Sequence, residues 1–436
     1  MKRLFEFAGY SVPDHLKLFQ MTDNPDVPGC HIYMEAQIFS PDSKRMVLHR
    51  SAHPHGSDPL DPEHQYFLCD FENDGTLTDL TDECGVTAPS LSPDGNVFYY
   101  FLDELSSKGR VVLKKPDLKT GKCEERGVIE SDGTFAPAYF FYPLSTISSD
   151  GKRIAIATGL RKKDSQEWPE HGLWVIDVET GEYRLILHGE EFCNLHLQYC
   201  RAKEEPHAIL IQHNHGSRLL YKTEGAKSGI GKGHVAALDP DSDFALRKIR
   251  KSDDPNADNT GFGLDLHIIS DDGSGWKTLP VGRDGIEFCQ GHQCWRGEST
   301  RVIASTLLFD TPLTATQELV EMESFPGNVH CRNNSAGGKR NILSRKVIPA
   351  HFLHFATDRS GSRIVSDYES DDGEWHLYTG KLGAMGDAAD LHFTLNLGSR
   401  EKSPWHPHPF LSPDGRKAFF NSSASGQLQA YCLELE

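Results

Sequence analysis

The chain of 436 residues lacks several features that would place it in common functional classes. It has no run of the roughly 20 apolar residues that a membrane-spanning helix needs. Its first residues include no apolar core of a secretory signal, so the sequence predicts a cytoplasmic protein. Its ten cysteines form no Cys-x-x-Cys pair, which disfavours a zinc ribbon or a thioredoxin-like dithiol. Most of them fall in apolar runs, and we expect buried free thiols.

Basic residues are also scarce, with 45 Lys and Arg against 63 Asp and Glu and a net charge of −18. We therefore expect neither a nucleic acid nor a membrane as a partner, because both favour a basic surface. An anionic substrate would need a local positive site, such as a metal ion or a few arginines in a cleft. The sequence does not indicate an oligomeric state.

Internal repetition is the strongest pattern that the chain contains. The repeated unit is a turn of the Ser-Pro-Asp-Gly type followed by a short strand, and the Asp-Gly step supplies the positive φ that a tight hairpin needs. Seven copies occur, at 40–50, 92–101, 148–159, 201–212, 296–305, 357–367 and 412–422. Most are followed by a further strand and turn, so each unit predicts a four-stranded antiparallel blade.

The spacing of the copies ranges from 52 residues (40 to 92) to 95 residues (201 to 296). Such intervals suit propeller blades of about 40–50 residues with longer loops. We predict an all-β fold, a seven-bladed β-propeller that residues 1–436 form as a single domain. The segment before residue 30 is expected to add a strand that closes the last blade. The polar segment 222–263 is interpreted as a loop or lid inserted in blade 4.

Two propeller-like halves, or a propeller joined to a hydrolase domain, are alternative arrangements. No Gly-x-Ser-x-Gly nucleophile elbow follows the repeats, which disfavours a peptidase of the propeller-plus-hydrolase kind.

Histidine recurs shortly before the repeated turns, where the innermost strand of each blade would line the central channel. The positions with this placement are His31, His196, His292, His354, His406 and His408. Imidazole is the commonest metal ligand. Because His406 and His408 flank Pro407 in an extended segment, we expect both to point to one side. Together with His292 they predict a site for a divalent transition metal.

A second group of polar residues surrounds the strand of the fourth repeat. His213 and His215 end this strand next to Arg218, and Arg201 lies at the turn that leads into it. A histidine close to arginines and a metal is a candidate general base. Histidines on a surface loop are the simpler interpretation of the same pattern.

These motifs resemble those of the oligogalacturonate lyases, seven-bladed propellers that cleave short pectin fragments and carry manganese. The resemblance spans nearly the whole chain and is closest at WHPHPFLSPDG; CHIY with FSPD, GHQCW and HFATDRSG also carry it. It implies that His292, His406 and His408 bind Mn²⁺. It further implies that His213 in IQHNHG is the catalytic base and that Arg201 in YCR lies near the substrate carboxylate.

The expected reaction is β-elimination, which removes the proton at C5 of a uronate and breaks the bond at C4. A metal or an arginine must withdraw charge from the carboxylate, and a base of near-neutral pKa must reach the proton. The remaining candidates are assigned to substrate binding: Arg218, His215, His196, Tyr199, His31 and His354. Of these, His215, His196 and Tyr199 are also alternatives for the base.

The chain departs from the family pattern at Ser403, where the family has a glutamine ligand, and in the 222–263 insertion. A hydroxyl replaces an amide oxygen poorly, which predicts weaker or more hydrated metal binding. Related propeller lyases act on rhamnose-glucuronate linkages or ulvan, so several uronate linkages stay open. A non-catalytic propeller that binds proteins is the alternative from another class, because fold alone does not give function. It predicts histidines scattered over the blade edges.

Overall fold

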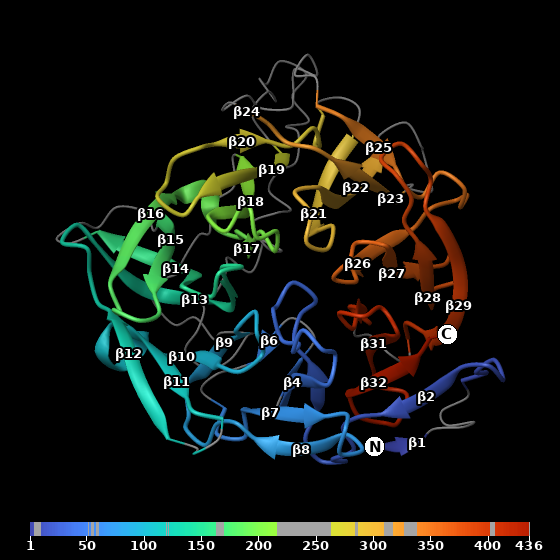
Figure 1. The fold of residues 1–436 in the computed structure, drawn as a ribbon, viewed down its shortest axis with the longest axis horizontal. Coiled ribbons are helices and arrows are strands. Elements are labelled where there is room, and N and C mark those ends of the chain that lie inside the picture. The colour runs from blue at the N-terminus through green and yellow to red at the C-terminus, as the bar shows by residue number, and fades with distance from the viewer. Residues whose placement is uncertain are drawn as a thin grey trace.

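The computed structural model describes residues 1–3, 10–50, 52–53, 56–57, 61–118, 120, 122–162, 170–215, 263–283, 287–308, 317–326, 338–401 and 406–435. Within these ranges the strands form seven sheets of four or five strands, set in a ring around a central axis (Figure 1). The only α-helix in this part of the chain is the short α1 (Leu105–Lys108). The predicted all-β, seven-bladed β-propeller is confirmed.

The first three blades follow the chain order. Blade 1 contains β3 (Gly29–His31), β4 (Arg45–Arg50), β7 (Gln65–Asp70) and β8 (Thr76–Asp79), with a small hairpin of β5 (Ala52–His53) and β6 (Gly56–Ser57) beside it. Blade 2 contains β9 (Val86–Leu91), β10 (Phe98–Glu104), β11 (Arg110–Pro116) and β12 (Cys123–Ile129). Blade 3 contains β13 (Phe135–Ile147), β14 (Arg153–Lys162), β15 (Glu170–Asp177) and β16 (Tyr183–Gly189).

Blades 4 to 6 complete the sequential part of the ring. Blade 4 contains β17 (Gln198–Tyr199), β18 (Ala208–His215), β19 (Gly263–Ser270), β20 (Lys277–Thr278) and β24 (Phe325–Pro326), preceded by the 3-10 turn η2 (Glu190–Phe192). Blade 5 contains β21 (Glu287–Trp295), β22 (Val302–Leu308), β23 (Gln317–Met322) and β25 (Arg340–Ile342). Blade 6 contains β26 (Phe352–Thr357), β27 (Arg363–Glu369), β28 (Glu374–Lys381) and β29 (Asp390–Ser399).

Blade 7 is built from both ends of the chain. It contains β30 (Phe410–Leu411), β31 (Lys417–Ser422), β32 (Gln429–Glu434), β2 (Lys17–Gln20) and β1 (Lys2–Arg3). β2 pairs antiparallel with β32, with Lys17 opposite Glu434 and Gln20 opposite Tyr431. Figure 1 shows the two termini near each other at this blade. The predicted closing strand is therefore confirmed, and it covers an edge that would otherwise stay open.

The repeated turns join the innermost strand of each blade to the next strand, as predicted. In blade 2 the backbone N–H of Ser92 donates to the carbonyl of Val97, and Gly95 between them has φ +73°. The same bond to the carbonyl five residues on closes the turns at Ser40, Ser148, Arg296, Asp358 and Ser412, and Cys200 closes a longer turn by donating to the carbonyl of Ala208. The turns therefore give a common register for comparing positions between blades.

Apolar side chains of the strands fill the space between neighbouring blades, with Trp174 and Trp375 among the largest fully buried ones. Nine free cysteines lie in the described residues, and seven of them are buried. No helix in the described part of the chain is long and apolar enough to span a membrane.

Candidate functional site

Four consecutive blades place a histidine at the same position, either in the innermost strand or in the segment that leads into it. Each lies four residues before the residue that closes the repeated turn, as His354 does before Asp358. The four positions are His196, His292, His354 and His408. Because the blades repeat around one axis, equal positions converge on the channel. His31 and His406 do not share this register, although the sequence pattern grouped them with the others. We call this mouth of the channel the histidine end.

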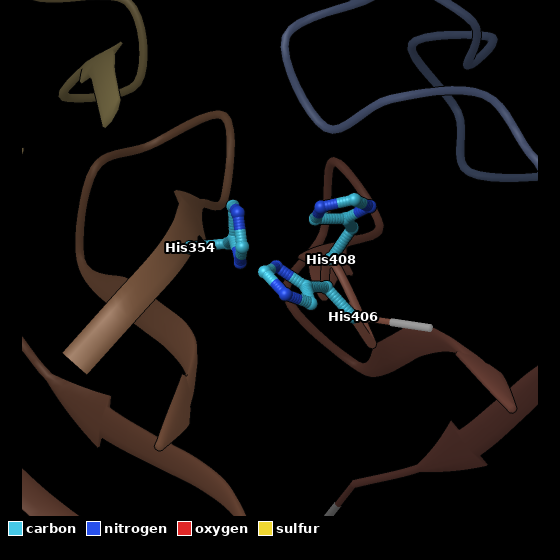
Figure 2. A group of neighbouring side chains, drawn as sticks. All are labelled: His354, His406 and His408. Carbon is cyan, nitrogen blue, oxygen red and sulfur yellow. The ribbon is translucent and has the colours of Figure 1, made fainter. Parts of the chain in front are cut away.

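Three imidazoles form a compact group at the histidine end. His354 belongs to β26, whereas His406 and His408 lie in the segment that leads into β30 (Figure 2). One ring nitrogen from each side chain lies within 4.8 Å of the others. His354 and His408 are buried and His406 is half-buried. His406 and His408 thus do approach a common point, as the His-Pro-His pattern predicted.

The predicted trio differs from the observed group in one member. His354 was assigned to substrate contact, but it occupies the place that the sequence interpretation gave to His292. The reason is the blade order, since blade 6 lies between blades 5 and 7 and its histidine reaches blade 7 first. His292 packs against His354, with their ring centroids 4.2 Å apart.

A buried carboxylate fixes the orientation of His354. The Nδ1–H of His354 donates to Oδ2 of Asp367 at 2.9 Å, and its backbone N–H donates to Oδ1 at 2.7 Å. Nε2 is then the nitrogen that faces a cation, as in the carboxylate–histidine pairs of many metal sites. Burial raises the pKa of Asp367 to about 8, although backbone N–H groups of His354 and His408 oppose this shift. A cation on the far side of the ring would favour the ionised carboxylate.

A second acid–histidine pair lies next to the imidazole group. The Nδ1–H of His196 donates to both oxygens of Glu35, at 2.9 and 3.0 Å. Burial raises the pKa of Glu35, and the neighbouring His196 lowers it. Tyr33 connects the two clusters, because its ring centroid lies 5.9 Å from that of His196 and 4.8 Å from that of His408. Burial and the charge of Glu35 raise the pKa of Tyr33 well above its usual value.

Sequence reasoning missed Tyr33, Glu35 and Asp367. Tyr33 and Glu35 follow shortly after His31 in the motif CHIYMEA. A hydroxyl and a carboxylate close to a histidine of the inner strand are the pattern that could have indicated them. Asp367 lies on the second strand of blade 6. The repeat pattern predicts this strand but does not indicate a functional side chain on it.

The backbone at two of these histidines is strained. His196 has φ +43° and His408 has φ +45°, in the left-handed region that non-glycine residues rarely adopt. Such conformations cost about 1–3 kcal/mol each and persist where the surrounding structure holds them, often at functional sites. Ala88 occupies the same register in blade 2 and shares the conformation, with φ +48°.

His31 lies away from the channel surface. Its Nδ1 donates to the carbonyl of Ile32 at 2.7 Å, and its ring contacts Phe410 edge-on at 4.7 Å. Burial lowers its pKa to about 4, so it is neutral near pH 7. The structure therefore makes His31 a packing residue between blades 1 and 7, instead of the substrate contact that its position before a turn had suggested.

Arg201 and His213 lie at opposite ends of blade 4, contrary to the expectation that they share a site. Tyr199 pairs with Ile209 across β17 and β18, so Arg201 continues toward the repeated turn while His213 continues toward the histidine end. The separation is six ladder positions, or roughly 20 Å. Tyr199 is also remote from substrate, because it is buried and its hydroxyl donates to Asp271 at 3.1 Å.

His213 itself lies on the second strand from the axis. Its Nε2–H donates to Glu191 at 3.0 Å, and its ring stacks on Phe192 with centroids 4.5 Å apart. It forms a second histidine–carboxylate group with Asp265 and His267 on β19. Arg218, Ser403, the side chain of His215 and the proposed lid up to residue 262 lie outside the described residues.

The fold and the ring of inward-facing histidines define a propeller with a histidine-lined channel. No protein-family model matches the chain, and no curated protein sequence does. Among solved structures, an oligogalacturonate lyase in complex with manganese has a TM-score of 0.64 and 17% identity, over 100% of this chain and 97% of that one. An oligogalacturonate lyase from Vibrio parahaemolyticus has a TM-score of 0.63 and 16% identity, over 100% and 98%.

The chain is therefore structurally similar to the oligogalacturonate lyases over its whole length, as its motifs predicted. At this level of identity the similarity shows a shared fold, and the chemistry has to be argued from the site.

Proposed function

We propose that the protein is a lyase that cleaves acidic oligosaccharides of the oligogalacturonate type by β-elimination at the histidine end. The observation that carries the proposal is the group of His354, His406 and His408, with ligand nitrogens within 4.8 Å and Asp367 orienting one ring. The similarity to solved oligogalacturonate lyases supports the same activity. The convergence of the histidines argues against the alternative of a non-catalytic binding propeller, which predicted scattered histidines.

The donor set fits a divalent transition metal, and we propose Mn²⁺. His354, His406 and His408 would hold it, with His292 packed beside them. Burial lowers the pKa of His406, which keeps its ring neutral and able to donate a lone pair. When bound, the ion would withdraw charge from the uronate carboxylate and so acidify the proton at C5. This role matters here because Arg201 lies at the other end of the blade.

The contacts support His196 as the base in place of His213. Glu35 accepts from Nδ1 of His196, which leaves Nε2 of that ring to take the C5 proton. The ring of Tyr33 contacts both His196 and His408, whereas His213 is bound to Glu191 one strand further from the axis. Proton transfer to His196 forms the C4–C5 double bond as the C4–O bond breaks. Tyr33, whose raised pKa keeps its hydroxyl protonated, is the proposed donor to the leaving oxygen.

The decisive experiment follows the ultraviolet absorbance of oligogalacturonates and of rhamnose-glucuronate oligosaccharides incubated with protein loaded with Mn²⁺. Elimination creates a conjugated double bond, so absorbance rises with one substrate class, and a chelator prevents the rise. An increase in reducing ends without absorbance would indicate hydrolysis instead and contradict the proposal. Absence of both signals on every uronate would also contradict it.

A further inference from the structure

The opposite mouth of the channel contains a cavity of about 680 Å³, which we call the turn-side cavity. Residues at or next to the repeated turns line it from all seven blades, whereas none of the channel histidines does. Its volume lies in the range of about 300–1,000 Å³ that is typical of small-molecule sites. The histidine end and the turn-side cavity are thus two separate openings of one channel.

The cavity wall contains a cation that makes no ion pair with a described residue, although the charge of Glu298 acts on it from a distance. Arg201 is half-buried in it and makes no hydrogen bond or ion pair to any residue that the structure describes. Burial lowers its pKa below the usual value of an arginine, which reflects the cost of keeping the charge there. Lys203, exposed at the rim of the same cavity, is likewise unpaired within the described ranges.

Most of the other charges of the wall are paired with protein groups, and the remaining acid, Asp94, accepts hydrogen bonds from Ser92 and Asn96. Arg359 binds Glu298 at 2.6 Å, and Lys115 binds Glu179 at 3.6 Å. A further wall acid, Asp150, pairs with Arg153 at 3.3 Å, just outside the cavity. Because a desolvated guanidinium without an anion is costly, Arg201 is placed to receive an anion from outside the chain.

The rest of the cavity surface indicates what the body of that anion is like. Phe39, Tyr99 and Phe410 supply aromatic surface to the wall. Three of the wall hydroxyls are occupied, since Ser92 donates to Asp94, Ser149 to the carbonyl of Ala202 and Thr357 to the carbonyl of Trp295. Few wall groups are therefore open to a further hydrogen bond, and a ligand with an apolar or flat body is favoured.

We propose that the turn-side cavity binds a small organic oxyanion, a carboxylate or a phosphate ester, whose charged group pairs with the Arg201 guanidinium and whose body packs on the aromatic wall. Lys203 lies where it attracts such an anion to the opening. The proposal does not depend on the lyase activity, because the two sites are at opposite ends of the channel.

The test uses three probes with one body: benzoate, phenyl phosphate and neutral benzamide. Calorimetry on the full chain should show binding of an anionic probe at concentrations up to about 10 mM and much weaker binding of benzamide. Arg201→Met, which keeps the apolar stem, should weaken anion binding by at least about tenfold, and Arg201→Lys should weaken it less. The stronger of the two anions identifies the carboxylate or the phosphate ester as the natural class.

His406→Ala is the matched control, because it removes a ligand at the histidine end and should leave probe binding unchanged. Circular dichroism and thermal melting of each variant establish that it is folded. The proposal is overturned if neither anion binds, if benzamide binds as tightly as the anions, or if folded Arg201→Met binds them like the wild type. Loss of binding in His406→Ala would also overturn it, by placing the probes at the other end.

Discussion

His354 donates from Nδ1 to Asp367 across the first hairpin of blade 6, at 2.9 Å, with both residues fully buried. This bond decides which ring nitrogen faces the channel. Carboxylates in this position typically improve metal affinity by 10- to 100-fold, because they fix the ring and raise its basicity.

Asp367→Asn tests that bond with little change in shape. The amide can still accept from Nδ1 but carries no charge, so we expect Mn²⁺ affinity to fall by about 10- to 100-fold while the protein stays folded. Titration of metal into metal-free protein, followed by calorimetry, gives the affinity. Equal affinities in the variant and the wild type would show that His354 does not depend on the carboxylate.

The membership of the metal site is tested by single alanine variants. His354→Ala, His406→Ala and His408→Ala should each remove bound metal and most of the elimination activity, because each deletes one of three ligands. His292→Ala should retain most of the metal, since His292 packs against His354 and lies outside the group of three converging ring nitrogens. Elemental analysis of the purified variants measures the content. Metal loss in His292→Ala with retention in His354→Ala would restore the trio expected from sequence.

Alanine variants of His196 and His213, both in blade 4, test which of the two histidines is the base. His196→Ala should lower kcat by about 10²- to 10⁴-fold with metal content unchanged, as loss of a general base does. His213→Ala should have a much smaller effect, because its ring is engaged by Glu191 and Phe192. A normal turnover of His196→Ala combined with an inactive His213→Ala would reverse the assignment.

Glu35→Gln probes the same base through its partner. The carboxylate of Glu35 orients the ring of His196 and stabilises the positive charge that the ring gains when Nε2 takes the proton. An uncharged amide in its place should therefore reduce kcat while the metal content stays unchanged. An unchanged kcat would exclude the pair from the reaction.

Acid should destabilise the fold through buried neutral histidines. Burial lowers the pKa of His171 from 6.5 to about 3, so this residue stays neutral in the folded protein while it takes up a proton in the unfolded chain. Its contribution is therefore complete above pH 6.5 and is lost as the pH falls toward 3. Between pH 7 and pH 5 the loss is about 2 kcal/mol. In His171→Leu the difference in unfolding free energy between these pH values should shrink by that amount, as measured with urea.

The repeated turns allowed the fold to be predicted in detail. The turns mark one position in each blade, and three of the seven contain an Asp-Gly step, so the blade number follows from their recurrence. The same register contains His408. Counted from the turn, His354 occupies the equivalent position in the neighbouring blade.

The errors in the site arose from treating proximity in sequence as proximity in space. Arg201 and His213 are twelve residues apart, but Arg201 lies in the turn before β18 and His213 near the far end of that strand, so they are at opposite ends of the blade. Glu35 and His196 show the converse, since 161 positions separate two residues that share a hydrogen bond. Neither relationship has a local pattern, because each depends on how the ring closes.

Blade 7 takes β2 from the beginning of the chain and β30 to β32 from its end, and the segment holding His406 and His408 leads directly into it. During synthesis, the earliest strand must wait for the latest before this sheet is whole. The sheet next to the imidazole group is therefore the one blade of the described ring that needs both ends of the chain to be complete.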